Sequence, residues 1–316
     1  MKSDPFLVDG PAVVSFSGGR TSAYLLHRVL ERGLRPDVHV VFCNTGMEDD
    51  RTLDFVEACG ERFGVEIVWL EYERKLLPKY KSADVETAAR RIREFFKLEF
   101  SEASRSGGLT SETAKEAGYR RVSRISASTW RDAGHAKHPF TNFVAMNGVP
   151  NGALRSCTTE MKIRVIKKYM LAMGYDEWTN VVGIRADEPL RAARLRKPPP
   201  ERWDHAVPLA DAGVTEDDVL AFWRAMPFDL DLERHPELGT YEGNCMLCHL
   251  KGEAKKVHVA RKNPAALRFW MQIEMASGSF FRPSLPYREI RRLAVLENDR
   301  RGERKEDDLG DCFCTD

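Results

Sequence analysis

The sequence contains no long hydrophobic run, no strong excess of charge of either sign and no internal repeat. A membrane-spanning helix needs about 20 consecutive apolar residues, and no segment of this chain provides them. The opening residues, MKSDPFLVDG, lack the apolar core of a secretory signal peptide. A formal net charge of +1 argues against a uniformly basic nucleic-acid-binding protein, although it leaves room for a local basic patch. We therefore expect a cytoplasmic protein without a membrane partner.

The two best-known phosphate loops are also missing. Residues 13–33 read VVSFSGGRTSAYLLHRVLERG, which is a short apolar run, a Ser-Gly-Gly turn and then apolar residues at helical spacing. The turn has neither the Lys of a Walker A motif nor the third Gly of the dinucleotide fingerprint. Its two glycines still allow a close approach to an anion, which the N-terminus of the following helix favours. The turn is either a phosphate-binding loop or an ordinary strand-to-helix connection capped by Ser and Thr.

Strand and helix patterns alternate over the first third of the chain. Buried strands are predicted within residues 37–46 and 65–73, with an amphipathic helix within residues 49–64 between them. This order predicts right-handed crossovers and a doubly wound, mostly parallel α/β sheet of the Rossmann-like type. Ligands of such sheets bind outside the carboxyl ends of the strands, where residues 17–22 and 44–48 both fall.

The chain is expected to divide near residue 200. A nucleotide-binding domain is predicted over residues 1–200, with a charged helical insertion at about residues 79–118. A helical C-terminal region that carries a CxxC and a CxC pair is predicted over residues 201–316.

Six segments, taken in order, resemble the phosphoadenosine phosphosulfate (PAPS) reductase family of the PP-loop superfamily. They are SFSGGRTS, VFCNTGMEDDRTLDFV, RSCTTEMKIRVIKKYM, VVGIRADEPLRAAR, HAVPLADAGVTEDDVLAFW and GNCMLCHLKG. The resemblance covers the chain from residue 13 to about residue 252. It implies a PP-loop fold that binds an adenine nucleotide.

The resemblance also implies a nucleotide site, made of the first loop and the turn after the second strand: Ser17, Gly18, Gly19, Thr21, Ser22, Asn44 and Thr45. Arg185, helped by Arg191 and together with Lys162, would contact the anionic end of the substrate. A planar guanidinium suits this role because it matches sulfate or phosphate oxygens with paired hydrogen bonds. The alternative for Arg185 is a surface ion pair with Asp187 or Glu188.

Two positions depart from the family's pattern. ATP-cleaving members of the superfamily usually carry an Asp that helps to hold Mg²⁺ where this chain has Thr21. A neutral hydroxyl is a weaker ligand, so Mg²⁺-assisted release of pyrophosphate would need Asp49, Asp50 or Asp187 as a substitute. The tail reads GDCFCTD and lacks the His that accompanies the redox Cys of plain PAPS reductases.

The seven cysteines, partly in close pairs, indicate thiol or metal chemistry in a reducing compartment. Cys43 lies in a predicted strand and Cys59 in a predicted helix, where a buried thiol usually acts as a small apolar group. The CxxC pair Cys245 and Cys248, with a distant third Cys, can hold a zinc ion, an iron–sulfur cluster or a redox dithiol. Zinc would need a fourth ligand, for which His249 or a tail cysteine is available.

The resemblance favours a [4Fe–4S] cluster. Iron–sulfur relatives place a cluster cysteine where this chain has Cys157, which is also the candidate catalytic thiol. With Cys245 and Cys248 this gives three ligands, and the fourth is either Cys312 or Cys314 or an open iron position for sulfur.

The resemblance thus implies an ATP-dependent sulfur-transfer enzyme. Its acceptor would be a tRNA base, a DNA backbone or a small metabolite, and a sulfur-donor or electron-donor protein would be a partner. The first alternative is a reductase of PAPS or adenylyl sulfate, which is reset by a thioredoxin-like donor. The second alternative is a non-enzymatic nucleotide-binding protein with a structural zinc.

Overall fold

A computed structural model of the chain describes residues 4–74, 79–100, 118–152, 155–197 and 201–296. Its centre is a six-stranded sheet with the order β4-β3-β2-β1-β5-β6, parallel except for the antiparallel edge strand β4. The strands of this sheet are β1 (Ala12–Phe16), β2 (Val38–Asn44), β3 (Ile67–Tyr72), β4 (Tyr119–Val122), β5 (Trp178–Val182) and β6 (Trp203–Ala206). A short hairpin is formed by β7 (Arg234–His235) and β8 (Gly239–Thr240).

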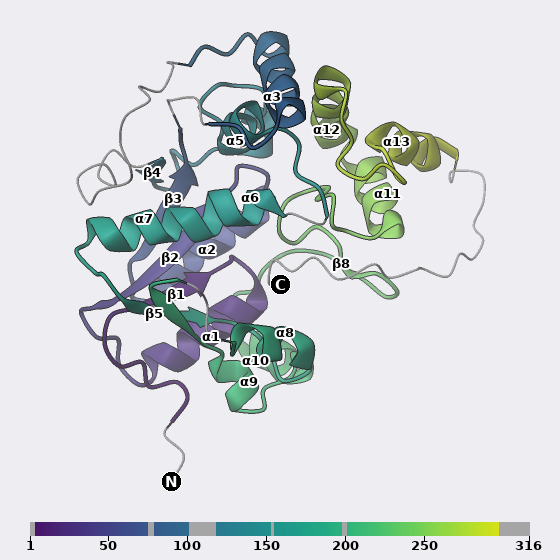
Figure 1. Cartoon of the computed structure of the whole chain (residues 1–316). Coiled ribbons are helices and arrows are strands. Elements are labelled where there is room, and N and C mark those ends of the chain that lie inside the picture. The colour runs from purple at the N-terminus through teal and green to yellow at the C-terminus, as the bar shows by residue number, and fades with distance from the viewer. Residues whose placement is uncertain (1–3, 75–78, 101–117, 153–154, 198–200, 297–316) are drawn as a thin grey trace.

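Helices cover both faces of the sheet (Figure 1). In chain order the helical elements are α1 (Arg20–Leu30), α2 (Asp50–Phe63), α3 (Ala83–Phe95), η1 (Trp130–Asp132), α5 (Pro139–Asn147), α6 (Ser156–Thr158), the π-helix η2 (Thr159–Ile163), α7 (Arg164–Ala172), α8 (Pro189–Leu195), α9 (Pro208–Asp211), α10 (Glu216–Ala225), α11 (Glu253–Lys262), α12 (Pro264–Ser277) and α13 (Tyr287–Leu296).

Each face of the sheet has its own apolar core. Alternate residues of the central strands point to opposite faces, so Val14 and Val40 join one cluster, whereas Val13 and Val41 join the other. The first cluster packs against α1, α2 and α10, and the second packs against α5, α7, α11 and α12. This two-sided burial explains why β2, VHVVFCN, is almost continuously apolar.

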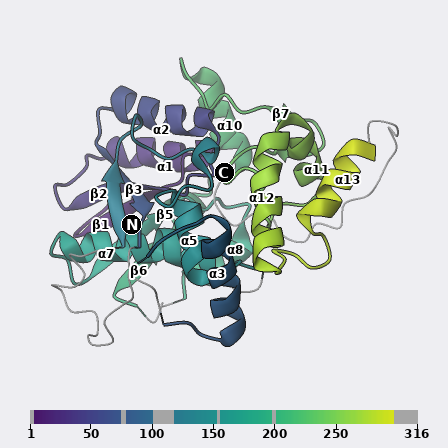
Figure 2. The same cartoon turned by 90° about the horizontal axis from the view of Figure 1, so that it is seen from above.

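Local signals fix where the helices begin and end. Asp49 caps α2 by accepting a hydrogen bond from the Arg51 N–H, and Gly64, in the left-handed conformation, ends the helix. The helices α11, α12 and α13 form a layer beside α3 and α5 (Figure 2), with α12 packed on α3. The C-terminal helices therefore share a core with the sheet.

The predicted doubly wound, mostly parallel α/β fold with a helical cysteine-containing region is confirmed. The predicted insertion at about residues 79–118 contains α3, whose Ala88, Ala89 and Ile92 are buried; residues 101–117 lie outside the described part. The sheet continues past the expected boundary at residue 200, because β6 pairs with β5. The division into two domains stays a prediction. Within the described ranges, none of the helices combines the length and apolarity needed to cross a bilayer.

The turn after β2 depends on a glycine and a buried histidine. Gly46 has φ +78°, and its carbonyl oxygen lies 3.1 Å from Nε2 of His138, the residue that caps α5. Nδ1 of His138 accepts a hydrogen bond from the Thr141 N–H, so Nε2 carries the proton. Burial lowers the pKa of His138 to about 4, which keeps the ring neutral. A Cβ at Gly46 would lie 2.4 Å from His138 Nε2, so only glycine fits this turn.

We predict that Gly46→Ala destabilises the protein more than Gly33→Ala. Both glycines have positive φ, but a Cβ at Gly33 meets nothing within 4 Å. Gly33→Ala should cost about 1 kcal/mol of unfolding free energy from backbone strain alone. Gly46→Ala should cost about 3 kcal/mol because His138 must also move. Urea unfolding curves compare the two variants, and equal losses would contradict the contact with His138.

Candidate functional site

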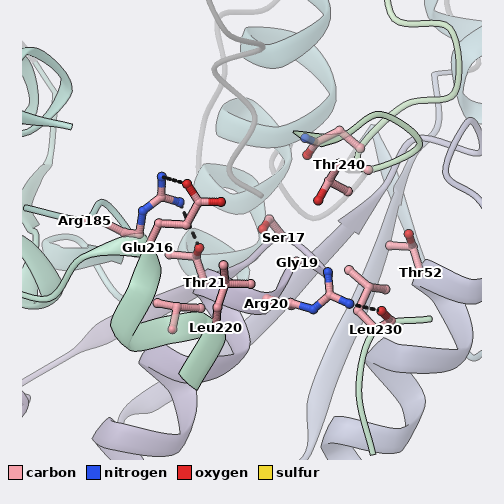
Figure 3. A pocket seen from close by; sticks show the side chains of 14 residues that line it. Ser17, Gly19, Arg20, Thr21, Thr52, Arg185, Glu216, Leu220, Leu230 and Thr240 are labelled. Carbon is pink, nitrogen blue, oxygen red and sulfur yellow. Dashed lines mark hydrogen bonds and ion pairs between the residues drawn. The ribbon is translucent and has the colours of Figure 1, made fainter. Parts of the chain in front are cut away.

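A pocket lies at the carboxyl end of β1, beside the N-termini of α1 and α10 (Figure 3). Five parts of the chain form it: the loop after β1, helix α2, the turn after β5, helix α10 and a segment that leads into the CxxC pair. Its lining residues are Ser17, Gly18, Gly19, Arg20, Thr21, Thr52, Arg185, Glu216, Val219, Leu220, Leu230, Thr240, Gly243 and Asn244. The pocket lies at the edge of the sheet where the sequence predicted a ligand.

The two glycines of the loop have different roles. Gly18 has φ +80°, and a Cβ there would lie 2.8 Å from Cγ2 of Thr52 on α2. Gly18 is therefore required for the loop to pack on α2, and a bulky residue there would disturb the fold itself. Gly19 is the N-cap of α1 with φ −101°, and no side chain caps this helix. The uncapped N-terminus of α1 is thus left for an anion.

Ser22 closes the loop from inside. Its Oγ accepts hydrogen bonds from the Ser17 N–H at 3.2 Å and the Ser17 hydroxyl at 3.0 Å, and it donates to the Gly19 carbonyl at 2.9 Å. The residue is 1% exposed. Ser22 therefore shapes the phosphate loop, whereas Ser17, Gly18, Gly19 and Thr21 line the pocket.

Arg185 reaches the pocket from the carboxyl end of β5. Its Nη1 donates to Oγ1 of Thr21 at 3.3 Å, and its Nε donates to Asp187 at 3.0 Å. The Glu216 carboxylate lies 4.0 Å from Nη2 of Arg185. Figure 3 shows these two side chains pointing toward each other. The Arg185 side chain is only 14% exposed. Arg185 therefore lines the pocket and also forms an ion pair with Asp187. From the sequence alone these two roles are alternatives.

Arg191 and Lys162 are not among the residues that line this pocket. Arg191, on α8, forms an ion pair with Glu188. Lys162 lies on η2, and its carbonyl is 4.0 Å from the Sγ of Cys43. Burial raises the pKa of Cys43 to about 12, and the nearby Lys162 only partly opposes this. The structure thus brings Arg185, but neither of the other two cations, to the pocket.

The acids considered as substitutes for the missing Mg²⁺ ligand all have basic partners. Asp49 pairs with Arg51 at 2.8 Å, Asp187 pairs with Arg185, and Asp50 pairs with Arg131. The carboxylate that lines the pocket is instead Glu216, at the start of α10. The sequence contains a signal for this position, because the capping box formed by Thr215 and Asp218 marks where α10 begins.

Asn44 and Thr45 support the turn after β2 and do not line the pocket. The Asn44 amide donates to Glu71 at 2.6 Å and to the Ser128 carbonyl at 2.9 Å. The Thr45 hydroxyl lies 2.8 Å from both carboxylate oxygens of Glu48 and 3.2 Å from the Sγ of Cys245. Thr45 therefore connects the carboxyl edge of the sheet to the first cysteine of the CxxC pair.

Backbone groups of the CxxC loop form hydrogen bonds with the edge of the sheet on one side and with the C-terminal helices on the other. The Met246 N–H donates to the Met47 carbonyl at 2.6 Å, on the turn after β2. From the other side, Trp270 Nε1 donates to the Met246 carbonyl at 3.1 Å, and the Tyr287 hydroxyl donates to the Leu247 carbonyl. These buried contacts hold Leu247 at φ +57°, a conformation that a Leu rarely adopts.

Cys157, Cys245 and Cys248 all lie near one buried phenol, that of Tyr287. Burial, followed by the charges of nearby groups that include all three thiols, raises the pKa of Tyr287 well above its usual value. Within the described residues, however, no group of three or more His, Cys, Asp and Glu side chains could hold a metal ion. The expected ligands Cys312 and Cys314 lie outside the described residues. The three cysteines thus share a neighbour, but in this structure they do not form a metal site.

His249, the candidate zinc ligand, is 3% exposed next to Cys248. Burial lowers its pKa to about 4, although the Asn151 backbone opposes this shift. Neither ring nitrogen makes a hydrogen bond of normal geometry in the described part of the chain. A buried imidazole without such a bond is suited to bind a metal or a ligand.

Sequence reasoning missed one wall of the pocket. Leu230, Thr240 and Asn244 come from a segment with no regular pattern, which the fold places opposite the loop after β1. Arg20 connects the two walls, because its Nε donates to Asp229 at 2.7 Å. The pairing joins residues more than 200 positions apart, and no local signal in the sequence predicts it.

A family model for the phosphoadenosine phosphosulfate reductase domain matches residues 11–121. The match includes the loop after β1 and the turn after β2, and it ends before Arg185 and the CxxC pair. An uncharacterised nin region protein, ORF290, of Escherichia phage lambda is 29% identical over 259 residues. That alignment covers 81% of this chain and 71% of the phage protein.

We predict that Arg51→Gln loosens the segment that carries the CxxC pair. Arg51 pairs with Asp49 at 2.8 Å and with Glu242 at 2.6 Å, and both acids raise the pKa of its guanidinium. Glu242 is 3% exposed, so losing its partner leaves a buried charge unpaired. Because Arg51 itself is 35% exposed, we expect a loss of about 2 kcal/mol, below the 3–5 typical of a buried pair.

Hydrogen exchange at the Met246 amide measures this loss. Adding Glu242→Gln to Arg51→Gln should recover part of the protection, because no charge is then left buried at position 242. Unchanged exchange in Arg51→Gln would contradict the role of this ion pair.

Proposed function

We propose, from the match of residues 11–121 to the model of the phosphoadenosine phosphosulfate reductase domain, that the protein is an ATP-dependent sulfur-transfer enzyme. In this proposal the loop after β1 binds the phosphates of ATP, and the enzyme adenylates an acceptor. Sulfur is then delivered at the side of the pocket that carries the cysteines.

One observation supports this proposal above the others: the phosphate loop and the CxxC segment face the same pocket. Thr240, Gly243 and Asn244 line it from one side, and Cys245 is the next residue along the chain. Cys245 Sγ also lies 3.2 Å from Thr45, at the end of the strand next to β1. A group activated on the nucleotide phosphate would therefore lie beside the thiols.

The chain's own residues supply anion binding on one side of this pocket. The uncapped N-terminus of α1 offers backbone N–H groups and the positive end of the helix dipole. Arg185 adds a guanidinium that is held by Thr21 and Asp187 and so needs little reorganisation on binding. Glu216, the carboxylate that lines the pocket, would hold a Mg²⁺ ion that accompanies the nucleotide, and its 4.0 Å contact with Arg185 would give way to the metal.

The proposed reaction has two steps. In the first, an acceptor oxygen attacks the α-phosphorus of ATP, the bond to the β-phosphate oxygen breaks, and pyrophosphate leaves. In the second, hydrosulfide or the terminal sulfur of a donor protein's persulfide attacks the activated carbon, and AMP leaves with the acceptor's oxygen. Hydrosulfide gives the thiolated product directly. A persulfide gives a mixed disulfide between donor and acceptor; a second thiol of the donor cleaves it, which releases the thiolated product and leaves a donor disulfide that an external thiol reductant reduces.

We propose further that Cys157, Cys245 and Cys248 hold a [4Fe–4S] cluster. Thiolates are the usual ligands of such clusters, and these three thiols lie near the same residue, Tyr287. The described residues contain no group of three or more side chains that could hold a metal ion, so in this proposal the three cysteines move together when the cluster binds. The fourth ligand then comes from elsewhere in the chain or from sulfur. When bound, a cluster with an open iron would supply a position for sulfur.

The alternative is a reductase of PAPS or adenylyl sulfate, the reaction for which the matched domain is named. In that reaction a thiolate attacks the sulfate sulfur and the nucleotide leaves. Release of pyrophosphate from ATP favours sulfur transfer, whereas production of sulfite from adenylyl sulfate favours the reductase.

We predict that Gly19→Ala and Arg185→Gln weaken ATP binding with little loss of stability. The φ of −101° at Gly19 suits any residue, and Gly19 lines the pocket, so in this proposal a methyl group there would compete with the phosphate for space. A charge-assisted contact contributes about 1.5–3 kcal/mol, so Arg185→Gln should raise the Kd for ATP by roughly tenfold to a hundredfold.

Isothermal titration measures the Kd for ATP, and thermal unfolding measures the stability of each variant. Arg196→Gln is the matched control, because Arg196 pairs with Asp211 and does not line the pocket. If Arg185→Gln loses stability in proportion to affinity, Arg185 is a structural ion-pair residue and not a ligand.

We also predict that protein purified without oxygen contains iron and sulfide. Cys157→Ala, Cys245→Ala and Cys248→Ala should each lower the iron content by more than half, because each removes one of three ligands. Cys59→Ala is the control, since Cys59 is a fully buried core thiol of α2. Metal analysis and the absorption spectrum decide this, and stoichiometric zinc without iron would support the structural-zinc alternative.

A further inference from the structure

The charge of the chain is distributed very unevenly. Residues 251–296 contain ten Lys and Arg but only three Asp and Glu, whereas the whole chain has 49 and 48. This stretch of 46 residues forms α11, α12 and α13. Its formal charge of +7 is concealed in the net charge of +1, because the rest of the chain is acidic.

An open groove with a volume of about 890 Å³ lies between the same three helices. Arginines stand along it: Arg261 and Arg268 from α11 and α12, and Arg288 and Arg291 from α13. Between them the groove is apolar, with large side chains that are accessible to solvent. Phe280 is 39% exposed and Met275 is 68% exposed.

Three of these arginines have no carboxylate within ion-pair distance: Arg268, Arg288 and Arg291, where the structure describes the chain. The acid in the groove, Glu274, faces inward and accepts hydrogen bonds from the Phe281 N–H at 3.2 Å and the Tyr287 N–H at 2.8 Å. Many arginines elsewhere do have acidic partners.

We propose that this groove, between α11, α12 and α13, binds a single strand of nucleic acid. Phosphates would lie against Arg268, Arg288 and Arg291, and a base would stack on Phe280 beside Arg288, whose guanidinium carbon lies 5.7 Å from the centre of that ring. Guanidinium groups that flank an apolar and aromatic surface are the combination that single-stranded nucleic acids require. A neutral or basic partner would instead bury these arginines without compensation.

The location links the groove to the cysteine loop. Trp270 on α12 and Tyr287 on α13 hold the carbonyls of Met246 and Leu247. A strand bound in the groove would therefore contact the same two helices that position the CxxC pair. The proposal does not depend on the chemistry proposed for the pocket, because binding is measured without nucleotide.

The test is fluorescence anisotropy with a labelled 24-nucleotide single-stranded DNA, the RNA of the same sequence and the duplex DNA. The variant Arg268→Ser/Arg288→Ser/Arg291→Ser removes three charges from the groove. Its control, Arg35→Ser/Arg121→Ser/Arg202→Ser, removes three exposed arginines elsewhere that sit in surface ion pairs. Such pairs contribute little to stability.

We expect the groove variant to raise the Kd for the single strand at least tenfold at 100 mM salt, and the control to change it less than twofold. The slope of log K against log salt should fall by about 2, the value for three phosphate contacts on a single strand. If the triple variant does not fold, Arg291→Glu alone should still weaken binding at least threefold. The Kd values for the single-stranded DNA and for the RNA of the same sequence show which of the two the groove prefers.

Three outcomes would overturn the proposal. They are equal losses in the two triple variants, no binding of any probe at 50 mM salt, and tighter binding of the duplex than of either single strand. Polyglutamate of matched charge that binds as tightly as the oligonucleotide would also overturn it, in favour of an acidic protein partner.

Discussion

The hydrogen bond from the Met246 N–H to the Met47 carbonyl, 2.6 Å long, joins the CxxC loop directly to the carboxyl edge of the sheet. Met47 belongs to the turn at the carboxyl edge of the sheet, and Met246 lies between the two cysteines of the CxxC pair. The turn can accept this contact only because Gly46 and the neutral His138 hold its shape. Together with the contact between Thr45 and Cys245, this bond sets the position of the cysteines relative to the loop after β1.

Much of the fold could be predicted because its signals are local. Short apolar runs, the Gly pair and the helical spacing of apolar residues placed the first three strands and two helices within a few residues. The sheet edge also placed Arg185 and the loop after β1 in one pocket. Asn44 shows where this reasoning ends: its amide is occupied by Glu71 and Ser128, and nothing near Asn44 in the sequence announces those partners.

The site features that the sequence did not predict depend on contacts between segments that lie far apart in the chain. Glu71 binds Asn44 and also Arg120 on β4, an antiparallel strand that follows a long excursion of the chain. The wall formed by Leu230 and Thr240 likewise comes from an irregular segment that is fixed by the contact of Arg20 with Asp229. The net charge of the whole chain gave no sign of its uneven charge distribution. The basic charge of residues 251–296 and the acidic charge of the remaining residues nearly cancel.

Gly183 limits the conformational freedom of the loop after β1, and this limit affects the thermodynamics of anion binding to the loop. A Cβ at this position would lie 3.4 Å from the Cα of Ser22, so β5 packs directly against the first turn of α1. With Gly18 packed on α2 from the other side, the loop is wedged between two elements and has already lost its conformational entropy on folding. An anion that enters therefore orders almost nothing in this wall, and its binding enthalpy is not offset by freezing the loop.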